Sequence, residues 1–266
     1  MVHKSFASSS LSSVNSNKTR KLPILLFDIM DTIVRDPFYQ DIPAFFRMSF
    51  NDLIECKHPT AWVEFEKGLI NEVYLAILEE APRVSPLRPW LLISSQKSVM
   101  GQVEKSTLSH YCHEGCRMEL SEIFFKDGRP LDLEGLKNCM KNGYTYINGI
   151  ESLLHNLKQN DYEMHAFTNY PIWYTLIEEK LRISNYLSWT FCSCITGKRK
   201  PAADSYLEVL RRLEVDPASC VFIDDRMVNI EAAINAGMVG LHFKDAASLK
   251  QDLTLLGIET SPRNKD

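Results

Sequence analysis

The sequence lacks any run of about 18 consecutive apolar residues, which excludes a helix that spans a membrane. It also lacks an excess of basic residues, since 30 lysines and arginines against 34 acidic residues leave a net charge of −4. This balance argues against binding of nucleic acid through bulk positive charge. The seven cysteines are an odd number without paired spacing, which favours a reducing compartment over a disulfide framework. We therefore expect neither a membrane nor a nucleic acid as partner, and the oligomeric state stays open.

Residues 1–21 lack acidic residues and hold seven serines and four lysines or arginines. They also lack the apolar stretch of a secretory signal. This composition is typical of an organelle transit peptide, and a disordered tail would have the same composition. Both interpretations place the segment outside the folded part of the chain.

The chain of 266 residues alternates strand-like and helix-like segments in its last hundred residues. A short apolar run at residues 22–28 predicts a first buried strand. The later strands are predicted at 162–168, 189–195, 220–224 and 239–243, and the helices at 171–181, 202–213, 227–237 and 245–255. This alternation predicts an α/β fold with a doubly wound parallel sheet covered by helices on both faces.

A helical insertion separates the first strand from this alternating unit. Apolar residues spaced three and four apart predict helices at 46–57, 61–71, 133–142 and 149–159. We expect a core domain of residues 22–36 and 145–258, and an inserted helical domain of residues 37–144. Residues 73–117 interrupt the helical pattern, and joining residue 72 to residue 118 restores it. We therefore interpret 73–117 as an extra segment, of the kind that a retained intron leaves.

Polar residues follow four of the predicted strands. In open parallel sheets ligands bind beyond the carboxyl ends of the strands, so these side chains should converge on one edge. They are Asp28, then Thr168 and Asn169, then Lys200, and finally Asp224 and Asp225.

These positions resemble the four motifs of the haloacid dehalogenase-like (HAD) hydrolases. The matching stretches are FDIMDTIV (27–34), HAFTN (165–169), KPAADSY (200–206) and IDDRMVNIEAAINAGM (223–238). The resemblance covers residues 22–255 apart from 73–117. It implies a Rossmann-like core and makes the insertion a C1 cap, a helical lid that closes over small soluble substrates.

The resemblance also implies chemistry on a phosphorylated small molecule. Asp28 would be the nucleophile and would form an aspartyl-phosphate that water later cleaves. Lys200 and Thr168 would bind the phosphoryl oxygens, and Asn169 belongs to the same substrate-binding set. The alternative is that Asp28 only caps a loop and that Lys200 is a surface charge.

A Mg²⁺ ion is the implied cofactor, because two anions repel and Mg²⁺ prefers oxygen ligands. Its expected ligands are Asp28, the backbone carbonyl of Met30 and Asp225, with Asp224 as an outer or alternate ligand. This acid pair favours a metal-dependent phosphatase over a dehalogenase.

One residue departs from the family pattern. Phosphatases of this family carry a second aspartate two residues after the nucleophile, where this chain has Met30, which cannot transfer a proton. Asp31 is the remaining candidate for the general acid. The alternatives are a dehalogenase or phosphonatase type of reaction, or a protein that has lost turnover and acts in binding or regulation.

Residues 27–46, 61–70, 165–174 and 187–201 resemble the plastid flavin mononucleotide hydrolases of plants within this family. That resemblance implies flavin mononucleotide (FMN) as the substrate, riboflavin as the product and a plastid location, with the cytoplasm as the alternative. Tyr170, Trp173 and Tyr174 adjoin the second motif. They either stack on a flavin ring or pack in the core.

Overall fold

The sheet of the computed structural model has five parallel strands in the order β3-β2-β1-β4-β5. The structure describes residues 20–72 and 119–263 of the chain. The strands are β1 (Ile24–Phe27), β2 (Met164–Thr168), β3 (Ser188–Cys192), β4 (Cys220–Asp224) and β5 (Val239–His242). The predicted α/β fold with a parallel sheet is confirmed.

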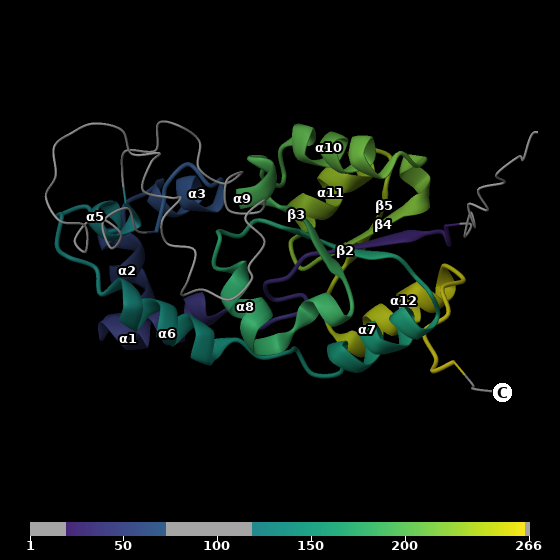
Figure 1. Cartoon of the computed structure of the whole chain (residues 1–266), viewed down its shortest axis with the longest axis horizontal. Coiled ribbons are helices and arrows are strands. Elements are labelled where there is room, and N and C mark those ends of the chain that lie inside the picture. The colour runs from purple at the N-terminus through teal and green to yellow at the C-terminus, as the bar shows by residue number, and fades with distance from the viewer. Residues whose placement is uncertain (1–19, 73–118, 264–266) are drawn as a thin grey trace, which may run out of the picture.

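Strand β1 lies at the centre and is fully buried on both faces. Leu25 and Phe27 belong to one apolar cluster, while Ile24 and Leu26 belong to a second one. Because successive side chains of a strand point to opposite faces, β1 requires helices on both sides. One face carries α7 (Ile150–Gln159), α8 (Tyr174–Leu181) and α12 (Ala246–Leu255), and the other carries α10 (Ala203–Leu213) and α11 (Met227–Asn235), as Figure 1 shows.

Shorter helical turns complete the part of the molecule around the sheet. They are η3 (Ile183–Asn185), α9 (Ser193–Thr196) and η4 (Pro217–Ser219). The strand predicted over 189–195 therefore ends earlier, at Cys192, because the chain turns into α9 and then into Gly197, whose φ is +68°. The turn places Ser193 at the edge of the sheet where the polar residues gather.

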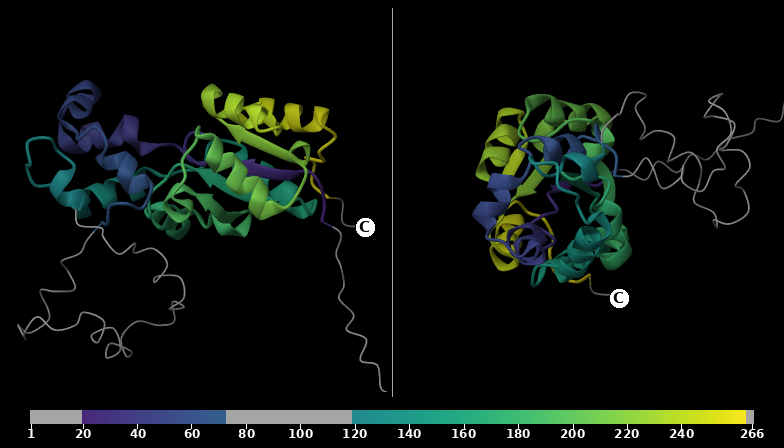
Figure 2. Two further views of the ribbon diagram at one scale, coloured as in Figure 1. Left: turned by 90° about the horizontal axis from the view of Figure 1, so that it is seen from above. Right: turned by 90° about the vertical axis from the view of Figure 1, so that its left-hand side faces the viewer.

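A group of short helices extends beyond one end of the sheet (Figures 1 and 2). We call it the helical lobe: η1 (Pro37–Tyr39), α1 (Asp41–Phe46), α2 (Phe50–Cys56), α3 (Ala61–Glu66), α5 (Leu120–Ile123) and α6 (Leu133–Gly143). The helix predicted over 46–57 is present as α2 but begins later, at Phe50, since Arg47 with φ +54° ends α1 and a capping box of Ser49 and Asp52 starts α2.

The two sides of the undescribed stretch 73–118 meet within the lobe. The amide of Leu120 donates to the carbonyl of Asn71 at 3.1 Å, and Asn71 forms a bridge with Glu119. The predicted extra segment 73–117 itself lies outside the described residues. If residue 72 were joined to residue 118, Leu120 would follow Asn71 by four positions, which is the spacing of an α-helical hydrogen bond.

Residues 1–19 lie outside the described part as well, and Arg20, the first described residue, contacts the folded part of the chain. Arg20 donates to the carbonyl of Leu213 at 2.6 Å and forms an ion pair with Glu163, and Lys21 donates to the carbonyl of Asn160. Arg20 and Lys21, which were predicted to belong to the N-terminal tail, therefore contact the sheet domain. Across the described ranges, no helix is both long and apolar enough to cross a membrane.

Candidate active site

Two carboxylates and one buried lysine meet at the carboxyl edge of the sheet. Asp28 follows β1, and Asp224 ends the neighbouring strand β4, where the order of the strands changes direction and ligands of such sheets bind. The Lys200 Nζ atom lies 2.9 Å from Asp28 Oδ1 and 2.6 Å from Asp224 Oδ2. Lys200 is only 2% exposed, which rules out the interpretation as a surface charge.

Asp224 is fully buried, and its oxygens are occupied by protein donors. Its Oδ1 accepts from the amide of Arg226 at 2.8 Å, and the Asn229 Nδ2 atom lies 3.0 Å from both oxygens. Together with the bond from Lys200, these contacts give Asp224 the role of holding the lysine. Asn229 was missed by the sequence analysis, because an asparagine within an amphipathic helix carries no signal of its own.

Asp28, Asp224 and Asp225 form an acidic cluster, with one carboxylate oxygen of each within 4.8 Å of the others. Burial raises the pKa of Asp28, and the charge of Lys200 opposes this rise. Burial, followed by the charges of Asp28 and Asp224, raises the pKa of Asp225 to about 7. Three crowded carboxylates of this kind are a donor set that suits a hard divalent cation such as Mg²⁺.

Thr168 and Asn169 lie beside this cluster at the end of β2. The Thr168 hydroxyl is buried and has no hydrogen-bond partner in the described part of the chain. Buried hydroxyls are normally paired, so this donor is available to a bound oxygen. The Asn169 side chain instead donates to the carbonyl of Lys200 and accepts from its amide, both at 2.8 Å. It therefore orients the loop between α9 and α10 that carries Lys200, which we call the lysine loop.

The residues that follow Asp28 in the chain include two further carboxyl groups, Asp31 and Asp36. Met30 is partly buried and packs against the core, while Asp31 adopts φ +54° and accepts a hydrogen bond from the amide of Asp36 at 2.9 Å. The Asp36 side chain accepts from the amide of Phe38 at the start of η1. Burial, and then the charges of Asp31 and Asp28, raise the pKa of Asp36 to about 6, although the bond from Phe38 lowers it.

Asp36 was missed by the sequence analysis. The only signal for it is the Asp-Pro pair at 36–37, which predicts a helix start and not a catalytic group. Its closeness to the charge of Asp28 arises from the path of the loop between β1 and η1. A carboxyl with a pKa of about 6 is suited to proton transfer near neutral pH.

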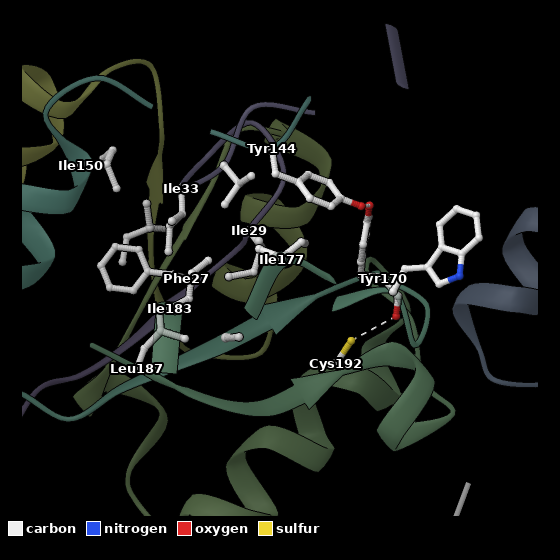
Figure 3. Close-up of a cluster of buried hydrophobic side chains, with 14 of the residues drawn as sticks. Phe27, Ile29, Ile33, Tyr144, Ile150, Tyr170, Ile177, Ile183, Leu187 and Cys192 are labelled. Atoms are coloured by element: carbon white, nitrogen blue, oxygen red, sulfur yellow. Dashed lines mark hydrogen bonds between the residues drawn. The ribbon is translucent and has the colours of Figure 1, made fainter. Parts of the chain in front are cut away.

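The aromatic residues beside the second motif pack in the core. Tyr170 and Trp173 are 3% and 1% exposed, and Figure 3 shows the Tyr170 hydroxyl against that of Tyr144, at 2.6 Å. The Tyr174 ring lies 5.1 Å from the ring of Trp189. Of the two interpretations of these residues, the structure therefore supports packing.

A different aromatic group is accessible at the start of the lobe. Tyr39 is 56% exposed, and its ring centroid lies 5.6 Å from those of both Phe38 and Phe50. Burial, and then the charges of Asp36 and Asp31, raise the pKa of Tyr39. We call Phe38, Tyr39 and Phe50 the aromatic platform.

Comparison with known proteins gives consistent results. The family model described as haloacid dehalogenase-like hydrolase matches residues 24–237. The chain is 51% identical over 245 residues, 92% of its own length and 82% of the relative's, to chloroplast flavin mononucleotide hydrolase 1 of Arabidopsis thaliana. It is 34% identical over 110 residues, 40% of its own length and 54% of the relative's, to a sesquiterpene phosphatase of Aspergillus oryzae.

Solved structures share the fold. A HAD-family enzyme of Bacteroides thetaiotaomicron, in complex with magnesium and inorganic phosphate, superposes with a TM-score of 0.56 at 14% identity. The match covers 85% of this chain and 95% of that one.

Proposed function

We propose that this chain, which belongs to the haloacid dehalogenase-like hydrolase family, hydrolyses flavin mononucleotide to riboflavin and inorganic phosphate. The observation that carries the phosphatase part is the placement of Lys200 between Asp28 and Asp224 beside an acidic cluster. The choice of flavin rests on the 51% identity to the Arabidopsis enzyme.

Asp28 is the nucleophile in this proposal. One of its oxygens attacks phosphorus in line, a bond to phosphorus forms, and the bond from phosphorus to the ribityl oxygen breaks. Lys200 opposes the rise in the pKa of Asp28 that burial causes and neutralises the phosphoryl oxygens, while the Thr168 hydroxyl donates to one of them. Water then hydrolyses the aspartyl-phosphate and releases inorganic phosphate.

Asp28, Asp225 and the carbonyl of Met30 would hold a Mg²⁺ ion, with Asp224 supporting the site from behind. The bound ion would supply positive charge against the phosphoryl group and the crowded carboxylates. The oxygen-only donor set fits this ion, and it favours a phosphatase over a dehalogenase reaction.

The leaving ribityl oxygen needs a proton, which Met30 cannot provide. Apart from Asp28 itself, Asp31 and Asp36 are the carboxyl groups nearest to Met30 in the chain, and the Asp31 carboxylate accepts a hydrogen bond from the amide of Asp36. Asp36, with its pKa raised to about 6, retains a proton to higher pH than an ordinary aspartate. We assign Asp36 as the general acid and keep Asp31 as the alternative.

The helical lobe is the cap of this enzyme, and the aromatic platform is the part of it that recognises the substrate. An isoalloxazine ring is flat and apolar on its faces, so an exposed tyrosine supported by two phenylalanines offers a stacking surface. Tyr39 follows Asp36 by three residues at the start of the lobe, and in this proposal the flavin ring stacks on it while the phosphate end reaches Asp28.

The decisive experiment incubates the protein with FMN, with and without Mg²⁺, and measures riboflavin and phosphate. Release of both products in Mg²⁺, at a rate above that for sugar phosphates, supports the proposal. Rapid hydrolysis of sugar phosphates without riboflavin would overturn the choice of substrate and leave the phosphatase assignment standing. No release from any phosphomonoester would favour a protein that has lost turnover.

A plastid location completes the proposal. It rests on the chloroplast enzyme to which the chain is similar and on the acid-free, serine-rich composition of the N-terminal segment. Fusion of residues 1–21 to a fluorescent protein should direct it to plastids, and a cytoplasmic signal would contradict the proposal.

A further inference from the structure

Glu66, the last residue of α3 in the helical lobe, binds the sheet domain in two ways. Its Oε2 atom lies 2.6 Å from Arg199 Nε, and its backbone carbonyl accepts from the Ser193 hydroxyl at 2.5 Å. The residue is 6% exposed, although it is charged. The ion pair of its carboxylate and the hydrogen bond of its carbonyl together join the end of α3 to the sheet domain.

Both partners of Glu66 lead to the lysine of the active site. Arg199 directly precedes Lys200 in the chain. The Ser193 hydroxyl also accepts from the amide of Tyr170 at 2.9 Å. Tyr170 follows Asn169, whose side chain holds the amide and the carbonyl of Lys200. Glu66 is thus connected to Lys200 from two directions.

The backbone of the lobe approaches the backbone of the sheet domain closely beside Glu66. Gly68, with φ +69°, lies so near the sheet domain that an added Cβ would stand 2.9 Å from the carbonyl oxygen of Cys194. Burial raises the pKa of Glu66, and the charge of Arg199 opposes this rise. Removing Arg199 leaves the Glu66 charge unpaired at a buried position, which is unfavourable, so this ion pair holds the lobe to the loop around Lys200.

We propose that Glu66 is a positioning residue for phosphoryl transfer, which acts through Arg199 to fix the Lys200 ammonium between Asp28 and the substrate phosphate. The proposal rests on the proposed phosphatase function. It makes correct placement of the lobe a condition for the chemistry at the sheet edge, where no lobe residue takes part directly.

The test compares Glu66→Gln, Arg199→Gln and the double variant with Lys141→Gln as a matched control. Lys141 on α6 pairs with Glu179 on α8 at 2.6 Å, so this ion pair also joins the lobe to the sheet domain. Neither residue of this pair belongs to the lysine loop. The substrate is p-nitrophenyl phosphate in Mg²⁺, whose leaving group needs no general acid and whose small ring tests phosphoryl transfer independently of flavin recognition.

We expect Glu66→Gln and Arg199→Gln each to lower kcat by about tenfold or more with little change in KM, because small misplacement of a catalytic group is costly. The double variant should be no slower than the single ones, since both remove the same contact. Affinity for inorganic phosphate in Mg²⁺, measured by calorimetry, should change as little as KM, because the loss falls on the transition state. Lys141→Gln should keep kcat within twofold.

A Glu66→Gln enzyme with the kcat of Lys141→Gln would overturn the proposal, as would losses that multiply in the double variant. A rise in KM alone would also overturn it, because it would make Glu66 a substrate contact. A parent enzyme that cleaves p-nitrophenyl phosphate but not FMN would contradict only the choice of substrate.

Discussion

The sheet edge and the helical lobe contribute differently to this molecule. At the sheet edge, Asp28, Thr168 and Asp224 each stand at the end of a buried strand, so the regular geometry of the sheet brings them together. The lobe is made of short helices, and its contributions come from turns and helix ends such as Tyr39 and Glu66. The regular parallel sheet thus positions the groups proposed for phosphoryl transfer. Turns and helix ends of the lobe position the residues proposed for substrate recognition and for alignment of Lys200.

The loop between β1 and η1 connects the sheet edge to the helical lobe and contacts both. Asp36 precedes η1 of the lobe, yet its amide binds Asp31, which lies only three residues beyond Asp28. If this comparison is correct, changes at the sheet edge should abolish turnover, while changes in the lobe should alter its rate or its selectivity.

The largest effect is expected at the nucleophile. Asp28→Asn should lower kcat by about 10³-fold or more, because the amide cannot form the acyl-phosphate. Lys200 remains paired with Asp224 in this variant, so the melting temperature should change little. Asp204→Asn, at an exposed position of α10, is the matched control and should retain activity. Retained turnover in Asp28→Asn would refute the assignment of the sheet edge.

The next effect concerns the connecting loop. Asp36→Asn should lower kcat for FMN by about 10²-fold, as expected for loss of a general acid, and p-nitrophenyl phosphate should be affected much less. Restoring an acid by Met30→Asp in the same enzyme should recover part of the rate. An unchanged FMN rate in Asp36→Asn, with a large loss in Asp31→Asn, would move the role to Asp31.

The pH dependence of stability checks the same residue without turnover. The pKa of Asp36 lies above its ordinary value of 3.8, at about 6, so its stabilising proton is lost as the pH rises through 6. Asparagine keeps the cap of η1 and cannot ionise. Asp36→Asn should therefore raise the melting temperature at pH 8 relative to the parent, with no gain at pH 4. An equal change at both pH values would contradict the raised pKa.

A smaller effect is expected at the aromatic platform. Tyr39→Ala should raise KM for FMN by about tenfold through the loss of stacking, with kcat for p-nitrophenyl phosphate unchanged. Tyr39→Phe keeps the ring and is the matched control. Equal KM values for all three enzymes would show that the flavin ring binds elsewhere.

The smallest effect is expected from the largest change in the chain. A variant that lacks residues 73–117 should keep the activity and melting temperature of the parent, because the Leu120 amide already donates to the Asn71 carbonyl and the deletion would place these residues four positions apart, the spacing of a helical hydrogen bond. Loss of folding or of FMN hydrolysis in this variant would show that the segment belongs to the lobe.

The sheet and most of its edge could be predicted from the sequence. Alternation of strand and helix patterns indicated the parallel sheet, and the polar residues after the strands indicated Asp28, Thr168, Lys200 and the acid pair. The meeting of these residues at one edge could be predicted because a strand end is a local property, and because parallel strands must present their carboxyl ends at a common edge. The general acid could not be found in this way, since the family position holds Met30.

The sequence by itself therefore determined the fold class and the groups available for phosphoryl transfer. The tertiary structure decided which of them touch: the burial of Lys200 between two carboxylates, the commitment of Asn169 to the lysine loop, and the pairing of Glu66 with Arg199, 133 residues away in the chain. The reason is physical. Periodicity and strand ends follow from neighbouring residues, whereas the pairing and burial of a charge depend on segments that meet only after the chain has folded.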